Sequence, residues 1–155
     1  MKLLSIDPNT RHSGAVLWID GKPEAHSVDL HRPNIDEMVK CLLDMTHRLW
    51  PDVVAIEDVF HGDNPHTTIV LAKLVGGIQH SIRNMYYRDV LVIGTAAIDK
   101  ACNLSYRAGE RKDATHALAR LELGDHISEH VSDAYCVGIA ALGKLKERGW
   151  AKEQA

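Results

Sequence analysis

LLSIDPNTRHSGAVLWIDG, residues 3–21, begins as a short apolar run, turns at Pro8-Asn9 and continues as a second apolar run. Asp20-Gly21 at its end is a turn signal of the two-residue hairpin type. Residues 24–30 (EAHSVDL) can therefore return antiparallel to the second run. We predict that strands over residues 2–6, 14–19 and 24–30 form an antiparallel meander.

The remaining chain alternates between helical and strand patterns. Apolar residues recur at helical spacing from Ile35, with Asn34 as the N-cap, and Pro51 disfavours helix at the residue before it, Trp50. We then expect strands at 53–57 (VVAIE) and 90–95 (VLVIGT), helices at 67–85, 114–123 and 131–145, and a loop at 103–111 within a polar stretch, 96–112. This order predicts an α/β fold in which a five-stranded mixed sheet carries helices on both faces.

Length and composition are those of one soluble domain, since the chain has 155 residues, of which 45% are hydrophobic and 25% charged. We expect a single domain over residues 1–148 and a flexible tail over 149–155. Asp7 interrupts the first apolar run, so no signal peptide is expected, and no run approaches the roughly 20 apolar residues of a membrane span. The three cysteines, Cys41, Cys102 and Cys136, form no CxxC pair and are expected to be free thiols in the cytoplasm.

Charge is unevenly distributed along the chain, although the net charge is only −3. The segment 73–112 has seven basic and three acidic residues, a net charge of +4, against −7 for the rest. Its basic residues are Lys73, Arg83, Arg88, Lys100, Arg107, Arg111 and Lys112. A basic belt on an acidic body can hold a phosphate backbone, although a solvated surface explains the same pattern.

Acidic residues stand at the ends of otherwise apolar elements. Asp7 ends the first strand, Glu57 ends VVAIE, and Asp133 lies one turn after His130 near the start of the last helix. Carboxyl ends of strands meet at one edge of such a sheet, and the i, i+3 spacing puts His130 and Asp133 on one helix face. An oxygen-rich site with one imidazole suits Mg²⁺ or Mn²⁺, and two such ions about 4 Å apart can promote phosphodiester hydrolysis.

Three motifs together resemble the RuvC-type Holliday-junction resolvases, a family with the RNase H-like fold. They are IDPNTRHSG (6–14), AIEDVF (55–60) and HVSDAYCVGIA (130–140), in the family's order and over nearly the whole chain. The resemblance implies a metal-dependent crossover junction endodeoxyribonuclease that cuts four-way DNA as a homodimer. A short chain with little beyond the core fold suits a bacteriophage member as well as a bacterial one.

Carried over residue by residue, the resemblance implies that Asp7, Glu57, His130 and Asp133 are the catalytic residues and metal ligands. Phe60 falls where the family has an aromatic residue that stacks on bases, although it can equally anchor its loop. Lys100 and Lys112 fall near the family's basic positions, with Arg107 and Arg111 as neighbours that could replace them. These four basic residues, Lys73 of the basic belt and Phe60 are the predicted DNA-binding residues.

The chain departs from the family pattern at three positions. Asn9 stands where the family has Gly, and asparagine tolerates the left-handed conformation that a turn can require. Asp58 adds a carboxylate beside Glu57, but strand neighbours point to opposite faces, so Asp58 should leave the site. His130 replaces the acid of many relatives. Because neutral imidazole suits Mn²⁺ better than Mg²⁺, Mn²⁺ should support cleavage at least as well, and activity should fall below about pH 6.5.

The helix at 67–85 is the expected dimer contact. It carries Ile69, Leu74, Val75 and Ile78, and its Gly76-Gly77 pair would permit close approach of a neighbour. The simpler interpretation is a helix packed on its own sheet.

Other functions fit part of the pattern. The four site residues would also serve a nuclease acting on RNA–DNA hybrids or on other branched DNA, and a non-catalytic junction-binding protein is a further alternative. Actin-like phosphotransferases have a similar first loop, but they need two such domains, for which 155 residues are too few.

Overall fold

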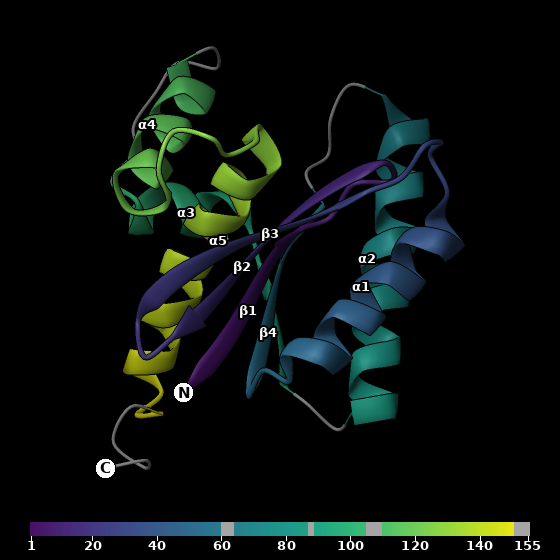
Figure 1. Cartoon of the computed structure of the whole chain (residues 1–155), viewed down its shortest axis with the longest axis horizontal. Coiled ribbons are helices and arrows are strands. Elements are labelled where there is room, and N and C mark those ends of the chain that lie inside the picture. Colours follow the sequence, from purple (N-terminus) through teal and green to yellow (C-terminus); the bar gives the residue numbers. More distant parts are fainter. Residues whose placement is uncertain (60–63, 87–88, 105–109, 151–155) are drawn as a thin grey trace.

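The computed structural model describes residues 1–59, 64–86, 89–104 and 110–150. The strands are β1 (Lys2–Asp7), β2 (His12–Ile19), β3 (Lys22–Asp29), β4 (Val53–Glu57) and β5 (Asp89–Ile93). The helices are α1 (Ile35–Leu49), α2 (Pro65–Tyr86), α3 (Thr95–Ala101), α4 (Glu110–Leu123) and α5 (Glu129–Glu147). The predicted α/β order is confirmed, and Figure 1 shows how the elements are arranged.

The strands form one mixed sheet in the order β3-β2-β1-β4-β5. β1 pairs antiparallel with β2, and β2 with β3, as the predicted meander requires. Asp20 (φ 51°) and Gly21 (φ 82°) both have positive φ, as expected of a type I′ hairpin turn. β4 joins β1 in parallel and β5 joins β4 in parallel, so the carboxyl ends of β1, β4 and β5 share one edge.

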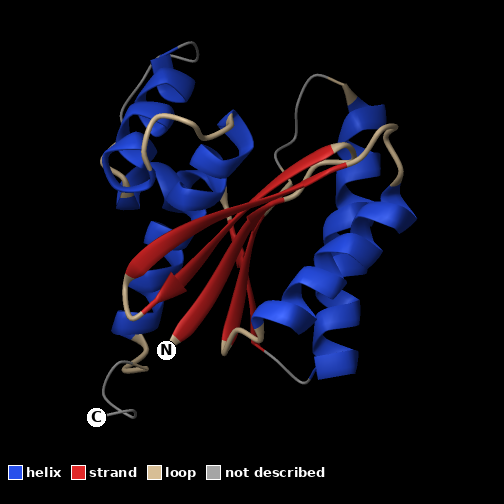
Figure 2. Cartoon of the chain, viewed as in Figure 1, coloured by secondary structure: helices blue, strands red, loops and turns tan. Residues whose placement is uncertain are grey.

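Helices cover both faces of the sheet, as Figure 2 shows. α1 and α2 bury one apolar core against Leu4, Ile6 and Ile56, while α5 buries a second core against Leu3 and Val53. The two cores follow from the strand period of two, because neighbouring residues of β1 and β4 point to opposite faces. Among the described residues, no helix combines the length and the apolar composition needed to cross a bilayer.

Helix ends follow local sequence signals. The Asn34 side chain accepts a hydrogen bond from the Glu37 N–H (3.0 Å), which confirms the predicted N-cap of α1. α1 ends at Leu49, and Trp50 takes the left-handed conformation (φ 49°) before Pro51, while its N–H donates to the Thr46 carbonyl. This conformation avoids the right-handed helical region that Pro51 disfavours.

Two sequence-based boundaries were wrong. α3, Thr95–Ala101, extends into the stretch 96–112; it is a helix of seven residues in which only Ile98 is buried, too short to show a helical period. α2 runs continuously through Gly76-Gly77, from Pro65 to Tyr86. The expected loop 103–111 ends earlier, because α4 begins at Glu110, while residues 105–109 lie outside the described residues.

The expected tail, 149–155, starts with ordered contacts. The Trp150 N–H donates to the Leu145 carbonyl (3.1 Å), and the Trp150 side chain packs against the core beneath α5. Residues 151–155 lie outside the described residues, so the boundary of the domain stays a prediction.

Two glycines let α5 lie directly on the sheet. A Cβ at Gly14 of β2 would overlap the His130 carbonyl, and a Cβ at Gly138 of α5 would overlap the Trp18 indole. The Trp18 indole N–H donates to the hydroxyl of Ser5, which is fully buried in β1 (3.0 Å). α5 is therefore seated on β1 and β2 at two contacts that leave no room for a side chain.

Candidate active site

Asp7 and Glu57 lie side by side at the shared edge of the sheet. The parallel register pairs Ile6 with Ile56, so the next residue of each strand is a carboxylate. Since Ile6 and Ile56 face α1 and α2, the alternation of the strands turns Asp7 and Glu57 toward α5. A cavity of about 190 Å³ lies between the two carboxylates and Leu71 and Val75 of α2.

α5 brings His130 and Asp133 to the same place. The helix is capped by Ser128, whose hydroxyl accepts from the Val131 N–H (3.2 Å), so His130 lies in the first turn. The His130 Nδ1 lies 2.7 Å from Asp7 Oδ2, which joins the helix to the end of β1. Both side chains are largely covered, with 31% of His130 and 15% of Asp7 exposed.

Asp133 carries a buried oxygen without a hydrogen-bond partner. Its Oδ1 has no donor within reach among the described residues. Burial, reinforced by the charge of Asp7, raises the pKa of Asp133 to about 6, while the Arg111 guanidinium opposes the shift. An unpartnered buried carboxylate oxygen costs free energy, so this position favours a cation.

Glu57 is the most perturbed carboxyl of the site. Burial, followed by the charges of Asp7 and Asp133, raises its pKa to about 8. The pKa of His130 is also raised, chiefly by its hydrogen bond with Asp7. The site therefore collects more negative charge than its surroundings solvate, which is the condition that a bound divalent cation relieves.

The donor atoms fit a hard divalent cation, but they are not yet arranged around one. Within the described ranges, no group of three or more His, Cys, Asp or Glu side chains is set to hold a metal ion as it stands. Asp7 and His130 are instead hydrogen-bonded to each other. A metal ion bound through both side chains would require this hydrogen bond to rearrange.

A family profile described as crossover junction endodeoxyribonuclease RuvC matches residues 4–141. The chain belongs to the RuvC family. A curated RuvC from Aliarcobacter butzleri (strain RM4018) is 34% identical over 93 residues, 53% of this chain. The match spans 59% of that protein, which is less than two thirds of its length.

Solved RuvC structures share the fold. A Thermus thermophilus RuvC structure has a TM-score of 0.72 at 19% identity, covering 96% of this chain and 97% of that one. T. thermophilus RuvC in complex with Holliday junction substrate has a TM-score of 0.69 at 19% identity, covering 90% of this chain and 91% of that one. The yeast mitochondrial Holliday junction resolvase, Ydc2, has a TM-score of 0.52 at 13% identity, covering 99% of this chain and 86% of that one. The RNase H-like fold expected from the sequence is confirmed.

Two departures from the RuvC pattern have structural explanations. Asn9 has a negative φ and therefore does not take the left-handed conformation. Its side-chain oxygen instead accepts from the Arg11 N–H (3.1 Å), and the Ser13 hydroxyl bridges the Asn9 N–H and carbonyl. Asp58 is exposed and accepts from the Val59 N–H (2.8 Å), although it lines the same cavity as Asp7 and Glu57.

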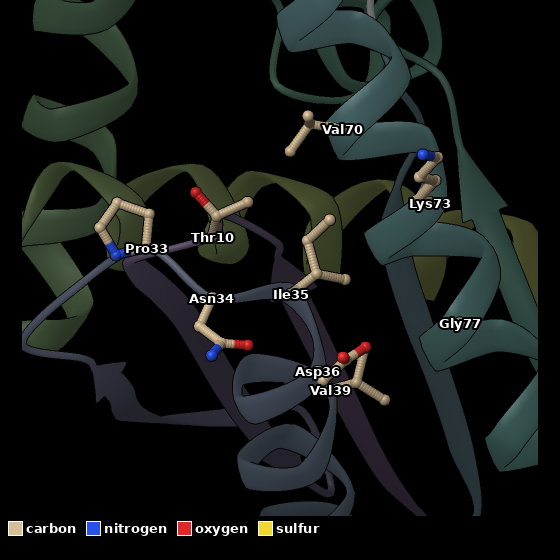
Figure 3. Close-up of a pocket in the computed structure, with 9 residues that line it drawn as sticks. All are labelled: Thr10, Pro33, Asn34, Ile35, Asp36, Val39, Val70, Lys73 and Gly77. Atoms are coloured by element: carbon tan, nitrogen blue, oxygen red, sulfur yellow. The ribbon is translucent and has the colours of Figure 1, made fainter.

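The predicted DNA-binding residues lie in three places. Arg111 and Lys112, in the first turn of α4, face the site: Arg111 Nε pairs with Asp99 Oδ1 at 2.7 Å, and Lys112 pairs with Glu129. Lys100 lines a separate groove with Lys144 and Lys146 of α5. Lys73 lines a groove of about 690 Å³ between α1 and α2, beside Val70 and Gly77 (Figure 3). Phe60 and Arg107 lie outside the described residues.

Sequence reasoning missed two histidines that lie beside the site. The His12 ring lies over the His130 ring, with centroids 6.4 Å apart and planes 20° apart. The His116 Nδ1 lies 2.7 Å from the Ser132 hydroxyl, which ties α4 to α5 next to Asp133. His12 could have been found from the sequence, because it lies two residues from Gly14 and therefore on the same face of the strand as that glycine. The contact of His116 had none, because it depends on how two helices cross.

Proposed function

We propose that this protein is a metal-dependent endonuclease that resolves four-way DNA junctions. The convergence of Asp7, Glu57, His130 and Asp133 at one sheet edge, in a chain of the RuvC family, carries the proposal. The raised pKa values of Glu57 and Asp133 support it, because charge crowding in a partly buried pocket is typical of catalytic carboxylates.

Asp7, Glu57 and Asp133 would hold Mg²⁺ or Mn²⁺ through oxygen, and His130 would add a nitrogen when neutral. The bound cations, two in our proposal, would supply activation of water and stabilisation of the leaving oxygen at the scissile phosphate. The protein's own part is to present deprotonated carboxylates and to keep charge near them balanced. Arg111, held by Asp99, opposes the pKa rise of Glu57 and Asp133 and so favours their charged forms.

The DNA would approach across the site from the α4 side. Arg111 and Lys112 interact electrostatically with the site carboxylates, and their partners Asp99 and Glu129 would release them to phosphates. Lys144 lies about 16 Å along the α5 axis from Asp133, so the groove with Lys100 would contact phosphates farther along an arm. Lys73, Phe60 and Arg107 remain proposed contacts.

We propose a homodimer through α2, so that two sites cut two opposing strands. Leu74, Val75 and Ile78 of the predicted dimer contact are buried in the chain's own core instead. Support comes instead from one exposed side of α2, where Ile69 is 54% exposed and Gly76, seven residues later, lies on the same face. A Cβ at Gly76 meets open space, which leaves room for a neighbour, whereas Gly77 faces Val39 of α1.

A reducing, cytoplasmic location is part of the proposal. Cys41, Cys102 and Cys136 are free thiols. Free cysteines are typical of proteins kept in reducing compartments, where junction DNA would be met inside a bacterial or phage-infected cell.

The decisive experiment compares a labelled four-way junction, linear duplex and an RNA–DNA hybrid as substrates, with Mg²⁺ or Mn²⁺. We expect paired nicks confined to the junction and no cleavage by Asp7→Asn, with Asp58→Asn as the matched control of an exposed neighbouring acid. Cleavage of the hybrid alone would replace the substrate and keep the metal chemistry. Junction binding without cleavage of any substrate would refute the enzyme and leave a binding protein.

A further inference from the structure

His12 is fixed at one edge by an acidic residue of the neighbouring strand. The β2–β3 register places His12 opposite Asp29, and the His12 Nδ1 lies 2.8 Å from Asp29 Oδ1. The other carboxylate oxygen of Asp29 accepts from the Ser27 hydroxyl (3.3 Å). A carboxylate at this distance accepts the Nδ1 proton, so the imidazole is held in one orientation although 45% of the side chain is exposed.

The backbone brings the held ring against His130. His12 and Gly14 lie two residues apart on β2 and therefore face the same side, toward α5. Because Gly14 has no side chain, the His130 backbone lies directly on the strand. The two imidazoles then lie nearly parallel, 20° apart, with centroids separated by 6.4 Å, within the range of stacked rings.

His130 thus has two contacts that restrict it. Its Nδ1 bonds to Asp7 Oδ2 at 2.7 Å, and one face of its ring looks onto His12. The bond to Asp7 must rearrange when an ion enters, because both side chains are proposed ligands. The contact with His12 does not involve a donor atom, so it can persist through that rearrangement.

We propose that His12 is a positioning residue that, anchored by Asp29, keeps the His130 imidazole oriented for metal binding. The inference rests on the proposed metal-dependent function. Ordering a free side chain on binding costs affinity, and loss of a residue that orients a ligand typically weakens metal binding about 10-fold or more. Removal of His12 should therefore weaken Mn²⁺ binding without removing a ligand.

The test measures Mn²⁺ binding without DNA, as the rise in thermal midpoint against MnCl₂ concentration. His12→Ala should raise the apparent Kd for Mn²⁺ about 10-fold, and His12→Phe, which keeps a flat ring but loses the bond to Asp29, should restore only part of the affinity. His31→Ala, which removes an exposed loop histidine, is the matched control and should leave the Kd unchanged. In a His130→Asp background, His12→Ala should have no effect, because the double-mutant cycle isolates action through His130.

Three outcomes would overturn the proposal. An unchanged Kd in His12→Ala, while the unsubstituted protein binds Mn²⁺ and Asp7→Asn does not, would refute the role of His12 and leave the metal site standing. An equal loss in the His130→Asp background would show that His12 acts by another route, such as a direct phosphate contact. Absence of any Mn²⁺ response in the unsubstituted protein would refute the metal site itself, and the positioning role with it.

Discussion

Glu57→Gln should stabilise the metal-free protein at alkaline pH while abolishing cleavage. The folded state holds the Glu57 proton up to about pH 8, whereas an unfolded glutamate releases it near 4.5. A carboxyl with a raised folded-state pKa contributes stability that is present below the unfolded pKa and is lost as pH rises through the folded one. Glutamine does not titrate, so the variant avoids that loss.

The size of the effect follows from the shift. At about 1.4 kcal/mol per pKa unit, the change from 4.5 to about 8 amounts to about 4 kcal/mol at pH 8. Asp7 and Asp133 share the repulsion, and protonation of one carboxyl relieves the others, so we expect about 2 kcal/mol. In a domain of this length the thermal midpoint would rise by about 4–8 °C.

The assay is urea denaturation with EDTA at pH 5 and pH 8. Glu57→Gln should match the unsubstituted protein at pH 5 and exceed it by about 2 kcal/mol at pH 8, whereas the control Asp58→Asn should show no such pH dependence. Added Mn²⁺ should stabilise the unsubstituted protein at pH 8 and reverse the order. A variant that is no more stable than the unsubstituted protein at pH 8 would refute the proposed crowding of charge.

Three further predictions concern activity and assembly. Cleavage with Mn²⁺ should fall as pH drops, and the fall should begin above pH 6.5 because the hydrogen bond to Asp7 raises the pKa of His130. In His130→Asp the fall should move to lower pH. Identical pH–rate profiles for the two proteins would contradict this. Arg111→Ala should lower cleavage at neutral pH about 10-fold and shift the pH optimum of cleavage upward, because Glu57 and Asp133 lose the cation that opposes their raised pKa. An unshifted pH optimum would leave Arg111 as a phosphate contact only. Gly76→Trp should yield a monomer in sedimentation, because the indole would occupy the proposed dimer interface. The circular dichroism spectrum should stay unchanged, since a side chain at this position meets open space within the chain. A persistent dimer would place the interface elsewhere.

Local patterns were enough to predict most of the fold and the convergence of the four candidate site residues. The strand VVAIE was predicted with its bounds, because a short apolar run rich in β-branched residues is typical of a strand buried on both faces. The Asp20-Gly21 pair predicted the hairpin, because a two-residue hairpin turn needs positive φ at both positions and these residues tolerate it. The convergence of Asp7 and Glu57 followed from strand direction, which the alternation of helix and strand implied.

Features that depend on long-range packing were not predictable. α3 was missed because only one of its seven residues, Ile98, is buried. β2 begins at His12, earlier than expected, because its polar first residues are paired with β3 rather than selected by hydrophobicity. The balancing role of Arg111 needs its contact with Asp99, twelve positions earlier, across a stretch with no repeating pattern.

The close packing of α5 at Gly14 and Gly138 means that core contacts fix the geometry of the site. His130 and Asp133 can move relative to Asp7 and Glu57 only if the helix lifts from the strand or the Trp18 indole gives way. Changes in loops and outer helices should therefore leave the distance between the two halves of the site unchanged. Conversely, a methyl group added at either glycine could silence the site without altering any residue that touches a ligand.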